Sequence, residues 1–271
     1  MNIDEFMPSP LNYTGSKFNL LPQLKKYFPK NHKDYTLVDL FAGGGSVFAN
    51  SQEFDSIIVN DYIRPLIQFY RYLQTTPWKI VLEEINKRNI SKTDQEAYLN
   101  LRSQFNVTKN HIDFFLLVCS CTNNMMRFNK KLQFNQTFGK RNFNPSTEKK
   151  LKQYHDVIYA NYNIQFLSEN FIDLEIPENS FVYLDPPYLI TEAGYNAYWG
   201  KDLEKKLYEY LSDLNSRGIK FMLSNVAEHK GKVNPYLDKL QNYNIIDIPY
   251  DYNKVSRAGK SNSKEIIVTN Y

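Results

Sequence analysis

The fold of this 271-residue chain is predicted most directly by Val38-Asp39-Leu40-Phe41-Ala42-Gly43-Gly44-Gly45-Ser46. Its apolar start predicts a buried strand, its glycines predict a tight turn, and we expect a helix to follow. Glycines let a ligand approach the backbone closely, and a helix N-terminus offers free N–H groups. The segment therefore predicts a site for a nucleotide-containing cofactor at the end of a strand.

Strands and helices alternate on both sides of an interruption in this chain. Helical patterns follow Gly45, cover Ile63–Leu73 and cover Asp202–Ser216, where Gly218 ends the last helix. Alternation of this kind predicts an α/β fold with a largely parallel, doubly wound sheet. The expected strands are Tyr35–Leu40, Ser56–Asn60, Phe181–Leu184, Ile219–Ser224, Asn244–Ile248 and Glu265–Asn270.

The middle of the chain shows no such alternation. Helical patterns cover Val81–Arg88 and Asp94–Gln104, an apolar stretch covers His111–Cys121, and a polar, basic stretch covers Thr122–Lys152. We interpret this part as an insertion. The expected domains are a cofactor-binding domain of residues 1–62 and 155–271 and an inserted, mainly helical domain of residues 63–154.

The glycine segment favours one kind of cofactor. A dinucleotide fingerprint needs a third glycine where this chain has Phe48, and the Gly-Lys-Ser/Thr of a P-loop is absent. S-adenosylmethionine, which carries no pyrophosphate, fits better. Asp61 follows the next strand, where an acid can accept hydrogen bonds from ribose hydroxyls. The alternative is a plain glycine turn, with Asp61 capping the following helix.

Asp185-Pro186-Pro187-Tyr188 follows the apolar run Ser180–Leu184, at the end of an expected strand. Ligands of open α/β sheets bind at strand ends. The prolines lack N–H groups and have fixed φ angles, so their carbonyl groups are held stiffly and remain free to accept hydrogen bonds. With the carboxylate and the flat tyrosine ring, the four residues predict a receptor for an amino group on an aromatic ring.

Composition and charge limit the remaining interpretations. The net charge is only +4, yet Arg127, Lys130, Lys131, Lys140 and Arg141 lie in fifteen residues without an acid, interleaved with phenylalanines. This pattern predicts a nucleic-acid contact, the alternative being a solvated basic face. Two cysteines and scattered histidines predict no metal site. No signal peptide or membrane span is evident, so we expect a cytoplasmic protein.

The order of these motifs resembles the Dam family of DNA adenine-N6 methyltransferases, in the D12 class and its alpha group, with T-even phage enzymes nearest in pattern. Tyr13-Thr14-Gly15-Ser16-Lys17 is similar to the family's cofactor motif near the N-terminus. Met126–Asn129 and Phe134–Arg141 resemble its DNA-reading hairpin. The resemblance implies a Rossmann-like methyltransferase sheet with an inserted target-recognition domain.

The resemblance also implies roles for individual residues. The catalytic group would be Asp185, Pro186, Pro187 and Tyr188. Cofactor would be bound by Tyr13, Lys17, Asp39, Phe41, Gly43, Gly45, Asp61 and Asp185, with Lys17 near the methionine carboxylate. DNA would be contacted by Arg127, Asn129, Thr137, Lys140 and Arg141, with Arg141 reading guanine.

The implied activity is methyl transfer from S-adenosylmethionine to N6 of an adenine flipped out of duplex DNA, in GATC, by a protein that acts as a monomer on DNA. Thr137 stands where relatives usually have proline, and Lys131-Leu132 stands where many have a turn glycine. Two other readings remain: an amino-methyltransferase of RNA or protein, and a non-catalytic DNA-binding relative. Ser256–Lys264 is expected to be either a loop that touches DNA or a plain hairpin loop.

Overall fold

The computed structural model describes residues 3–11, 15–129, 131–191, 199–248 and 263–271. Its centre is an eight-stranded sheet in the order β3-β2-β1-β4-β5-β8-β7, with β6 paired to β5. Strands β1 to β5 are parallel, and β8 runs antiparallel between β5 and β7. The strands are β1 (Thr36–Asp39), β2 (Ser56–Asn60), β3 (Ile164–Leu167), β4 (Ser180–Leu184), β5 (Lys220–His229), β6 (Lys232–Val233), β7 (Asn244–Ile248) and β8 (Ser263–Thr269).

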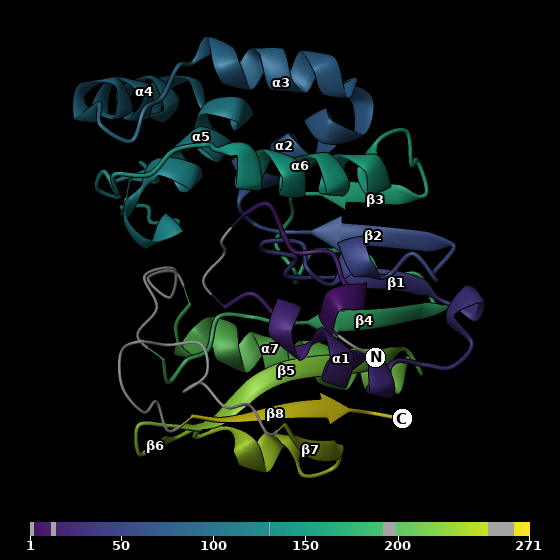
Figure 1. The fold of residues 1–271 in the computed structure, drawn as a ribbon. Coiled ribbons are helices and arrows are strands. Elements are labelled where there is room, and N and C mark those ends of the chain that lie inside the picture. Colours follow the sequence, from purple (N-terminus) through teal and green to yellow (C-terminus); the bar gives the residue numbers. More distant parts are fainter. Residues whose placement is uncertain (1–2, 12–14, 130, 192–198, 249–262) are drawn as a thin grey trace.

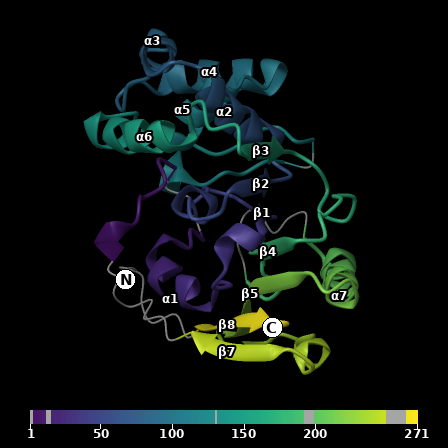
Figure 2. The same ribbon diagram turned by 90° about the vertical axis from the view of Figure 1, so that its right-hand side faces the viewer.

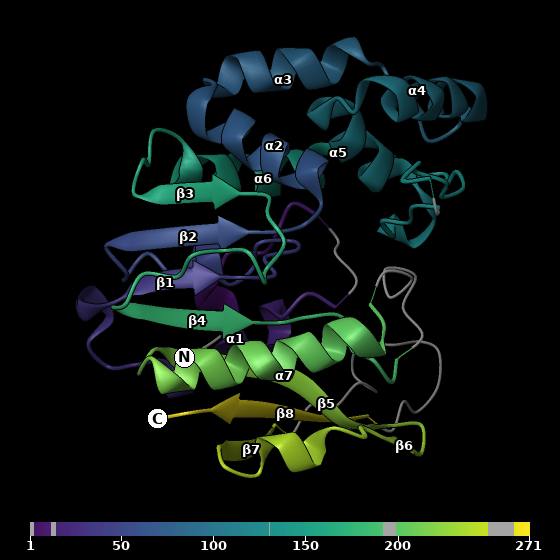
Figure 3. The ribbon, with the colours of Figure 1, turned by 180° about the vertical axis from the view of Figure 1, so that it is seen from behind.

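Helices cover both faces of the sheet, with α1 on one side and α7 on the other (Figure 2). Figure 3 shows α7 running across β4 and β5. The helices are α1 (Leu21–Leu24), α2 (Arg64–Thr75), α3 (Trp78–Lys87), α4 (Gln95–Thr108), α5 (His111–Ser120), α6 (Pro145–Ile158) and α7 (Lys201–Ser216). Single 3-10 turns are Ile3–Glu5, Phe18–Leu20, Lys25–Tyr27, His32–Asp34, Phe48–Asn50, Thr122–Asn124 and Leu237–Leu240.

The alternation of side chains along each strand divides the core into two parts. On β1, Leu37 packs into the core on the α1 face, whereas Val38 packs into the core under α7. All five residues of β4 are buried, as expected for a central strand covered on both faces. Phe114 and Phe115 of α5 belong to the same core as Leu37, so α5 shares that core with the sheet.

Between β2 and β3 the chain forms α2 to α6 and one irregular hairpin, which gather beyond the β3 edge (Figure 1). The neighbours β1 and β4 mark the point where the strand order reverses. In open α/β sheets, ligands bind at the carboxyl ends of the strands at this point. The glycine segment leaves the sheet at the end of β1, and Asp185 follows the end of β4.

All six expected strands are present, and Gly218 ends α7 with a φ of 70°. Two strands were not predicted: β3, which has only four residues, and β6, which has two. Helix α6 was also missed, because its lysines were assigned to a polar stretch. Asn144 caps this helix by accepting hydrogen bonds from Ser146 and Thr147.

The prediction of a helix after Gly45 is wrong. The chain forms only the 3-10 turn Phe48–Asn50 there. Side chains take the carbonyl groups that a longer helix would use: Asn50 donates to Ser46 O at 2.8 Å, and Ser51 donates to Val47 O at 2.8 Å. Competition of this kind from Asn and Ser shortens helices. The glycine segment therefore lacks the helix N-terminus that was expected to face a ligand.

Candidate active site

Three carboxylates lie at the carboxyl ends of neighbouring parallel strands. Asp39 ends β1, Asp61 directly follows β2, and Asp185 directly follows β4. All three line one cavity of about 980 Å³, together with the glycine loop and the Pro-Pro-Tyr segment. The cavity is near the upper end of the range for small-molecule sites, about 300–1,000 Å³. The fold therefore brings the segments that were expected to bind the cofactor and to catalyse the reaction to a single site.

The glycine loop is held in a conformation that requires glycine. Gly45 has a φ of 74°, and a Cβ atom there would lie 1.9 Å from the hydroxyl oxygen of Tyr154. Asp61 braces the loop, since its Oδ2 accepts from the N–H of Gly43 at 2.8 Å and its Oδ1 accepts from Ile63 at 2.8 Å. A carboxylate has about four acceptor positions, so Asp61 keeps capacity for a ligand hydroxyl.

Two buried tyrosines hold the other side of this loop, and sequence reasoning missed both. Tyr70 on α2 donates its hydroxyl to the carbonyl of Gly43 at 2.8 Å. Tyr154 on α6 donates to the carbonyl of Gly45 at 3.4 Å. Burial raises the pKa of both hydroxyls, so they stay protonated donors. Two helices that lie between β2 and β3 in the chain thus set the shape of the loop that follows β1.

Asp39 is almost fully buried at the base of the cavity. Its side chain is 1% exposed, and its Oδ2 accepts from the N–H of Phe48 at 3.1 Å. Burial raises the pKa of Asp39 to about 8; the Phe48 hydrogen bond opposes this rise, and the charges of Asp185 and Asp61 add to it. Asp39 therefore holds the backbone that follows the glycine loop, through its hydrogen bond with Phe48.

Asp185 is held by two side chains. Lys17 Nζ lies 2.9 Å from Oδ2, and the Tyr188 hydroxyl donates to Oδ1 at 2.8 Å. The same ammonium lies 5.1 Å from the centre of the Tyr188 ring and donates to Gly15 O at 3.2 Å. These contacts fix the plane of the carboxylate. Lys17, expected near a cofactor carboxylate, thus lies directly at the catalytic motif, and its side chain is only 6% exposed.

Glu265 on β8 adds a charge that the sequence did not signal. It is 6% exposed, and burial raises its pKa, with the Lys17 ammonium opposing the rise and the Asp185 carboxylate adding to it. The Lys17 ammonium therefore lies in the field of two carboxylates, Asp185 and Glu265. Pro186 is buried beside Asp185, and Pro187 also lines the cavity.

An aromatic wall lines the cavity beside the glycine loop. Phe41, predicted from the motif, lies 5.2 Å from Phe171 and 5.7 Å from Trp199 between ring centres. Phe171 follows β3 and Trp199 precedes α7, and neither was predicted. Nothing in the sequence separates these two rings from the many aromatic residues of the core.

The expected hairpin is present in irregular form. Phe128 pairs with Phe134 and Cys121 pairs with Phe138 as isolated antiparallel bridges. Arg127 is used within the hairpin, because its guanidinium donates to both the side chain and the carbonyl of Asn135, at 3.0 and 2.9 Å.

The turn of the hairpin lies at the rim of the cavity. Asn129 shapes it by accepting from the N–H groups of Lys131 and Gln133 at 2.9 and 3.1 Å. Leu132, at its tip, has a φ of 56°, is 54% exposed and lines the cavity. The tip therefore takes the left-handed conformation without the glycine that relatives were expected to have there.

The other residues expected to contact DNA lie along the second arm of the hairpin. Thr137, Lys140 and Arg141 are all exposed. The hydroxyl of Thr137 is 2.9 Å from that of Thr122, and Arg141 donates to Oδ1 of Asn124 at 2.6 Å. Tyr13, Lys130 and residues 256–262 lie outside the described residues.

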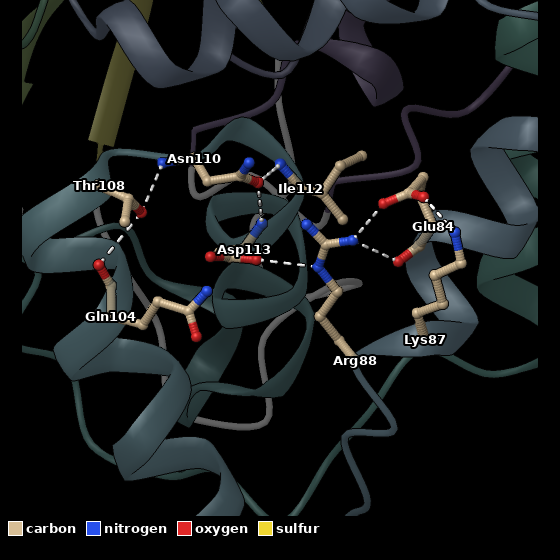
Figure 4. A network of polar contacts seen from close by, with 8 residues as sticks. All are labelled: Glu84, Lys87, Arg88, Gln104, Thr108, Asn110, Ile112 and Asp113. Carbon is tan, nitrogen blue, oxygen red and sulfur yellow. Dashed lines mark hydrogen bonds and ion pairs between the residues drawn. The ribbon is translucent and has the colours of Figure 1, made fainter.

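A network of polar contacts positions the turn between α4 and α5 next to this hairpin (Figure 4). Arg88, directly after α3, joins Glu84 at 2.6 Å to the buried Asp113 on α5 at 3.0 Å. Asn110 caps α5 by accepting from Ile112 and Asp113.

The adjacent Lys109 connects this network to the hairpin. Its ammonium donates to the carbonyl of Leu132 at 3.0 Å. Lys109, directly after α4, thereby holds the hairpin tip at the cavity rim.

The strand order, the glycine loop after β1 and Asp-Pro-Pro-Tyr after β4 define a Rossmann-like methyltransferase fold. The chain belongs to the family of D12 class N6 adenine-specific DNA methyltransferases, whose model matches residues 13–253. Methyltransferases of this class use S-adenosylmethionine.

Relatives include two modification enzymes and a DNA adenine methylase. The modification methylase StsI of Streptococcus sanguinis is 35% identical over 98% of this chain and 43% of its own length. The type II methyltransferase M.FokI of Planomicrobium okeanokoites is 34% identical over 99% of this chain and 43% of its own. A DNA adenine methylase of Vibrio cholerae is 29% identical over 79% of this chain and 80% of its own.

The chain thus spans about two fifths of the length of the first two relatives. Within the described ranges, no helix is long and apolar enough to cross a membrane. Among the same residues, no three His, Cys, Asp or Glu side chains gather as a metal ion would require.

Proposed function

We propose that this chain transfers a methyl group from S-adenosylmethionine to N6 of an adenine in duplex DNA. The observation that carries the proposal is the fixed Asp185 carboxylate, which lies between Lys17 and Tyr188 in the same cavity as the glycine loop. The family and the modification methylases among the relatives support the same reaction.

The residues of the cavity fit the cofactor. The loop leaves no room for a side chain at Gly45, Asp61 retains acceptor positions for ribose hydroxyls, and Phe41 offers a flat wall. Bound S-adenosylmethionine would supply a methyl group that its sulfonium sulfur has already activated. The chain's own residues would then act on the nucleophile.

The adenine amino group is a poor nucleophile because its lone pair is delocalised into the ring. Lys17 and Tyr188 use two of the roughly four acceptor positions of Asp185, which leaves about two. One of these would accept one N6 hydrogen, and the Pro186 carbonyl would accept the second N6 hydrogen. Acceptors placed in this way stabilise the positive charge that develops on the nitrogen as the new N–C bond forms and the methyl–sulfur bond breaks. One N6 proton would then be lost to solvent, and the products would be N6-methyladenine and S-adenosylhomocysteine.

The adenine must leave the duplex to reach Asp185, at a cost of a few kcal/mol. The Tyr188 ring would stack on the extruded base. We propose that residues 63–154 form the part that selects the target, with the hairpin of Arg127, Asn129, Thr137, Lys140 and Arg141 on the DNA. The exposure of Thr137, Lys140 and Arg141 and the Leu132 tip at the cavity rim support this role.

GATC is the recognition sequence that we propose to test first, because exposed Arg141 suits a guanine and the methyl group of exposed Thr137 suits a thymine. Placement in the alpha group, near the T-even phage enzymes, is supported by the motif order of glycine loop, hairpin and Asp-Pro-Pro-Tyr. Action as a monomer on DNA and a cytoplasmic location stay predictions.

The test is a tritiated-methyl assay with duplex DNA, RNA and protein as acceptors. Label should enter duplex DNA and map to N6-methyladenine, and Asp185→Ala should abolish it while DNA binding persists. Label in RNA or protein alone would identify another kind of amino-methyltransferase. Sequencing with modification detection would then give the recognition sequence, whether or not it is GATC.

A further inference from the structure

Glu204 is a buried carboxylate that the proposed reaction does not use. It lies in the first turn of α7 and is 1% exposed. Within the described part of the chain, no lysine or arginine forms an ion pair with it. Burying a carboxylate costs stability unless hydrogen bonds compensate. Its two oxygens therefore have to be satisfied by neutral donors.

Both donors are aromatic side chains. The indole Nε1 of Trp199 donates to Oε2 of Glu204 at 2.5 Å, and the hydroxyl of Tyr208 donates to Oε1 at 3.1 Å. Hydrogen bonds to an ionised acceptor are about twice as strong as those between neutral groups. The carboxylate thus fixes the orientation of the indole ring, which otherwise could turn about its side-chain bonds.

The fixed ring is part of the cavity wall. Trp199 is 9% exposed and packs edge-on to Phe41, with an interplanar angle of 81°. It also packs against Phe171, with ring centres 5.8 Å apart. The three rings come from the segments that follow β1 and β3 and from the residue that precedes α7. They form a cage suited to a flat, apolar ring.

A second link anchors the same carboxylate to the sheet. The side chain of Asn225 on β5 donates to the Tyr208 hydroxyl at 3.3 Å, and its Oδ1 accepts from the N–H of Val226 at 2.7 Å. Glu204 therefore stands between a ring on the cavity wall and a central strand. A carboxylate that served only to stabilise the N-terminus of α7 would need neither contact.

We propose that Glu204 is a positioning residue, which holds the Trp199 ring so that the cage of Phe41, Phe171 and Trp199 fits the purine of the nucleoside cofactor. This inference rests on the proposed function. It assigns to Glu204 an effect on cofactor affinity, exerted through Trp199, and no part in the methyl transfer itself.

The experiment uses S-adenosylhomocysteine as the probe, with binding measured by calorimetry. Glu204→Ala should weaken binding about tenfold, because two donors lose their acceptor and the indole is released. Glu204→Gln should stay within about threefold of the original, since its amide oxygen still accepts from the indole. The matched control is Glu209→Ala, an exposed acid on the same helix, which should bind as the original does.

Two readouts separate positioning from a general loss of structure. The chain has two tryptophans, so in a Trp78→Phe background Trp199 alone reports by fluorescence. Glu204→Ala should shift that emission, whereas Glu204→Gln should restore it. In methyl transfer, the KM for S-adenosylmethionine should rise about tenfold while kcat changes less than about threefold.

A failure of this inference can be distinguished from a failure of the proposed function. An original chain that binds no S-adenosylhomocysteine overturns the proposed function, and this inference with it. An original chain that binds, beside a folded Glu204→Ala variant with equal affinity, overturns this inference alone. If Glu204→Ala does not fold, Glu204→Leu, which fills similar space but cannot accept a hydrogen bond, replaces it in a double-mutant cycle with Trp199→Phe: additive losses in affinity overturn the inference, and non-additive losses support it.

Discussion

Lys17 Nζ lies 2.9 Å from Oδ2 of Asp185, and both side chains are largely shielded from water, at 6% and 17% exposure. The pair joins a segment that precedes β1 to the loop that follows β4, across the reversal point of the sheet. Removing one partner of a shielded pair leaves the other charge uncompensated. The pair therefore couples the N-terminal motif to the catalytic one.

Lys17→Ala should lower kcat/KM for methyl transfer at least about a hundredfold, since Asp185 loses the group that fixes one of its oxygens. The measurement is steady-state kinetics with duplex DNA, with thermal unfolding as a check on the fold. Lys26→Ala, an exposed lysine in the same part of the chain, is the control and should match the original. Equal loss in both variants would contradict a specific role for the pair.

Tyr188 should show separable effects of its ring and its hydroxyl. Tyr188→Phe keeps the ring but removes the 2.8 Å hydrogen bond to Asp185, and should lower kcat about tenfold. Tyr188→Ala also removes the stacking surface, worth about 1–3 kcal/mol per base, and should cost a further tenfold or more. Single-turnover kinetics on duplex DNA measure both. If the two variants behave alike, the ring does not stack on the base.

The glycine segment after β1 and the Asp-Pro-Pro-Tyr segment after β4 could be predicted from the sequence, because each follows an apolar run typical of a buried strand. The side chains that hold the glycine loop and form the aromatic wall beside it could not be predicted. Tyr70, Tyr154 and Trp199 belong to an aromatic-rich chain, and only the fold separates a tyrosine that holds a glycine carbonyl from one that fills the core. Side-chain contacts around Asn50 likewise replaced the helix expected after Gly45.

Asp39 should make stability fall as pH rises. Its pKa is about 8 in the folded chain against an ordinary value of 3.8, so between these pH values the folded state holds a proton that the unfolded chain has released. This stabilising contribution is complete below the unfolded pKa and is lost as pH rises through about 8. Asp39→Asn, which keeps an acceptor for Phe48, carries no such contribution.

Urea unfolding at about pH 5.5 and about pH 8.5 should show the original losing more stability than Asp39→Asn, by on the order of a few kcal/mol. Burial also raises the pKa of Asp61, Glu204 and Glu265, but these act in both proteins and cancel in the difference. Asp55→Asn, at an exposed position, should follow the original. Parallel curves for the original and Asp39→Asn would show that Asp39 is ionised in the fold.

Gly45→Ala should destabilise the chain and abolish cofactor binding. The new Cβ would lie 1.9 Å from the Tyr154 hydroxyl oxygen and 2.6 Å from the Phe48 ring, at a φ of 74°. The matched control is Gly218→Ala, which has a φ of 70° and open space around the new Cβ. It should cost only the backbone strain, about 1–2 kcal/mol, and Gly45→Ala should cost clearly more. Equal losses in chemical unfolding would show that the loop relaxes without cost.

Replacing Arg127 and replacing Arg141 by alanine should impair DNA methylation in different ways. Arg127 is held within the hairpin by Asn135, so Arg127→Ala should loosen the hairpin and lower methylation of all sequences alike. Arg141 is exposed and has a single contact to Asn124 there, so Arg141→Ala should mainly relax discrimination at one guanine, by about 1–3 kcal/mol. Methylation rates on duplexes with each base of the site changed in turn measure both, with Lys149→Ala as an exposed basic control. A uniform loss from Arg141→Ala would place that arginine on the phosphate backbone, where it positions the hairpin but reads no base.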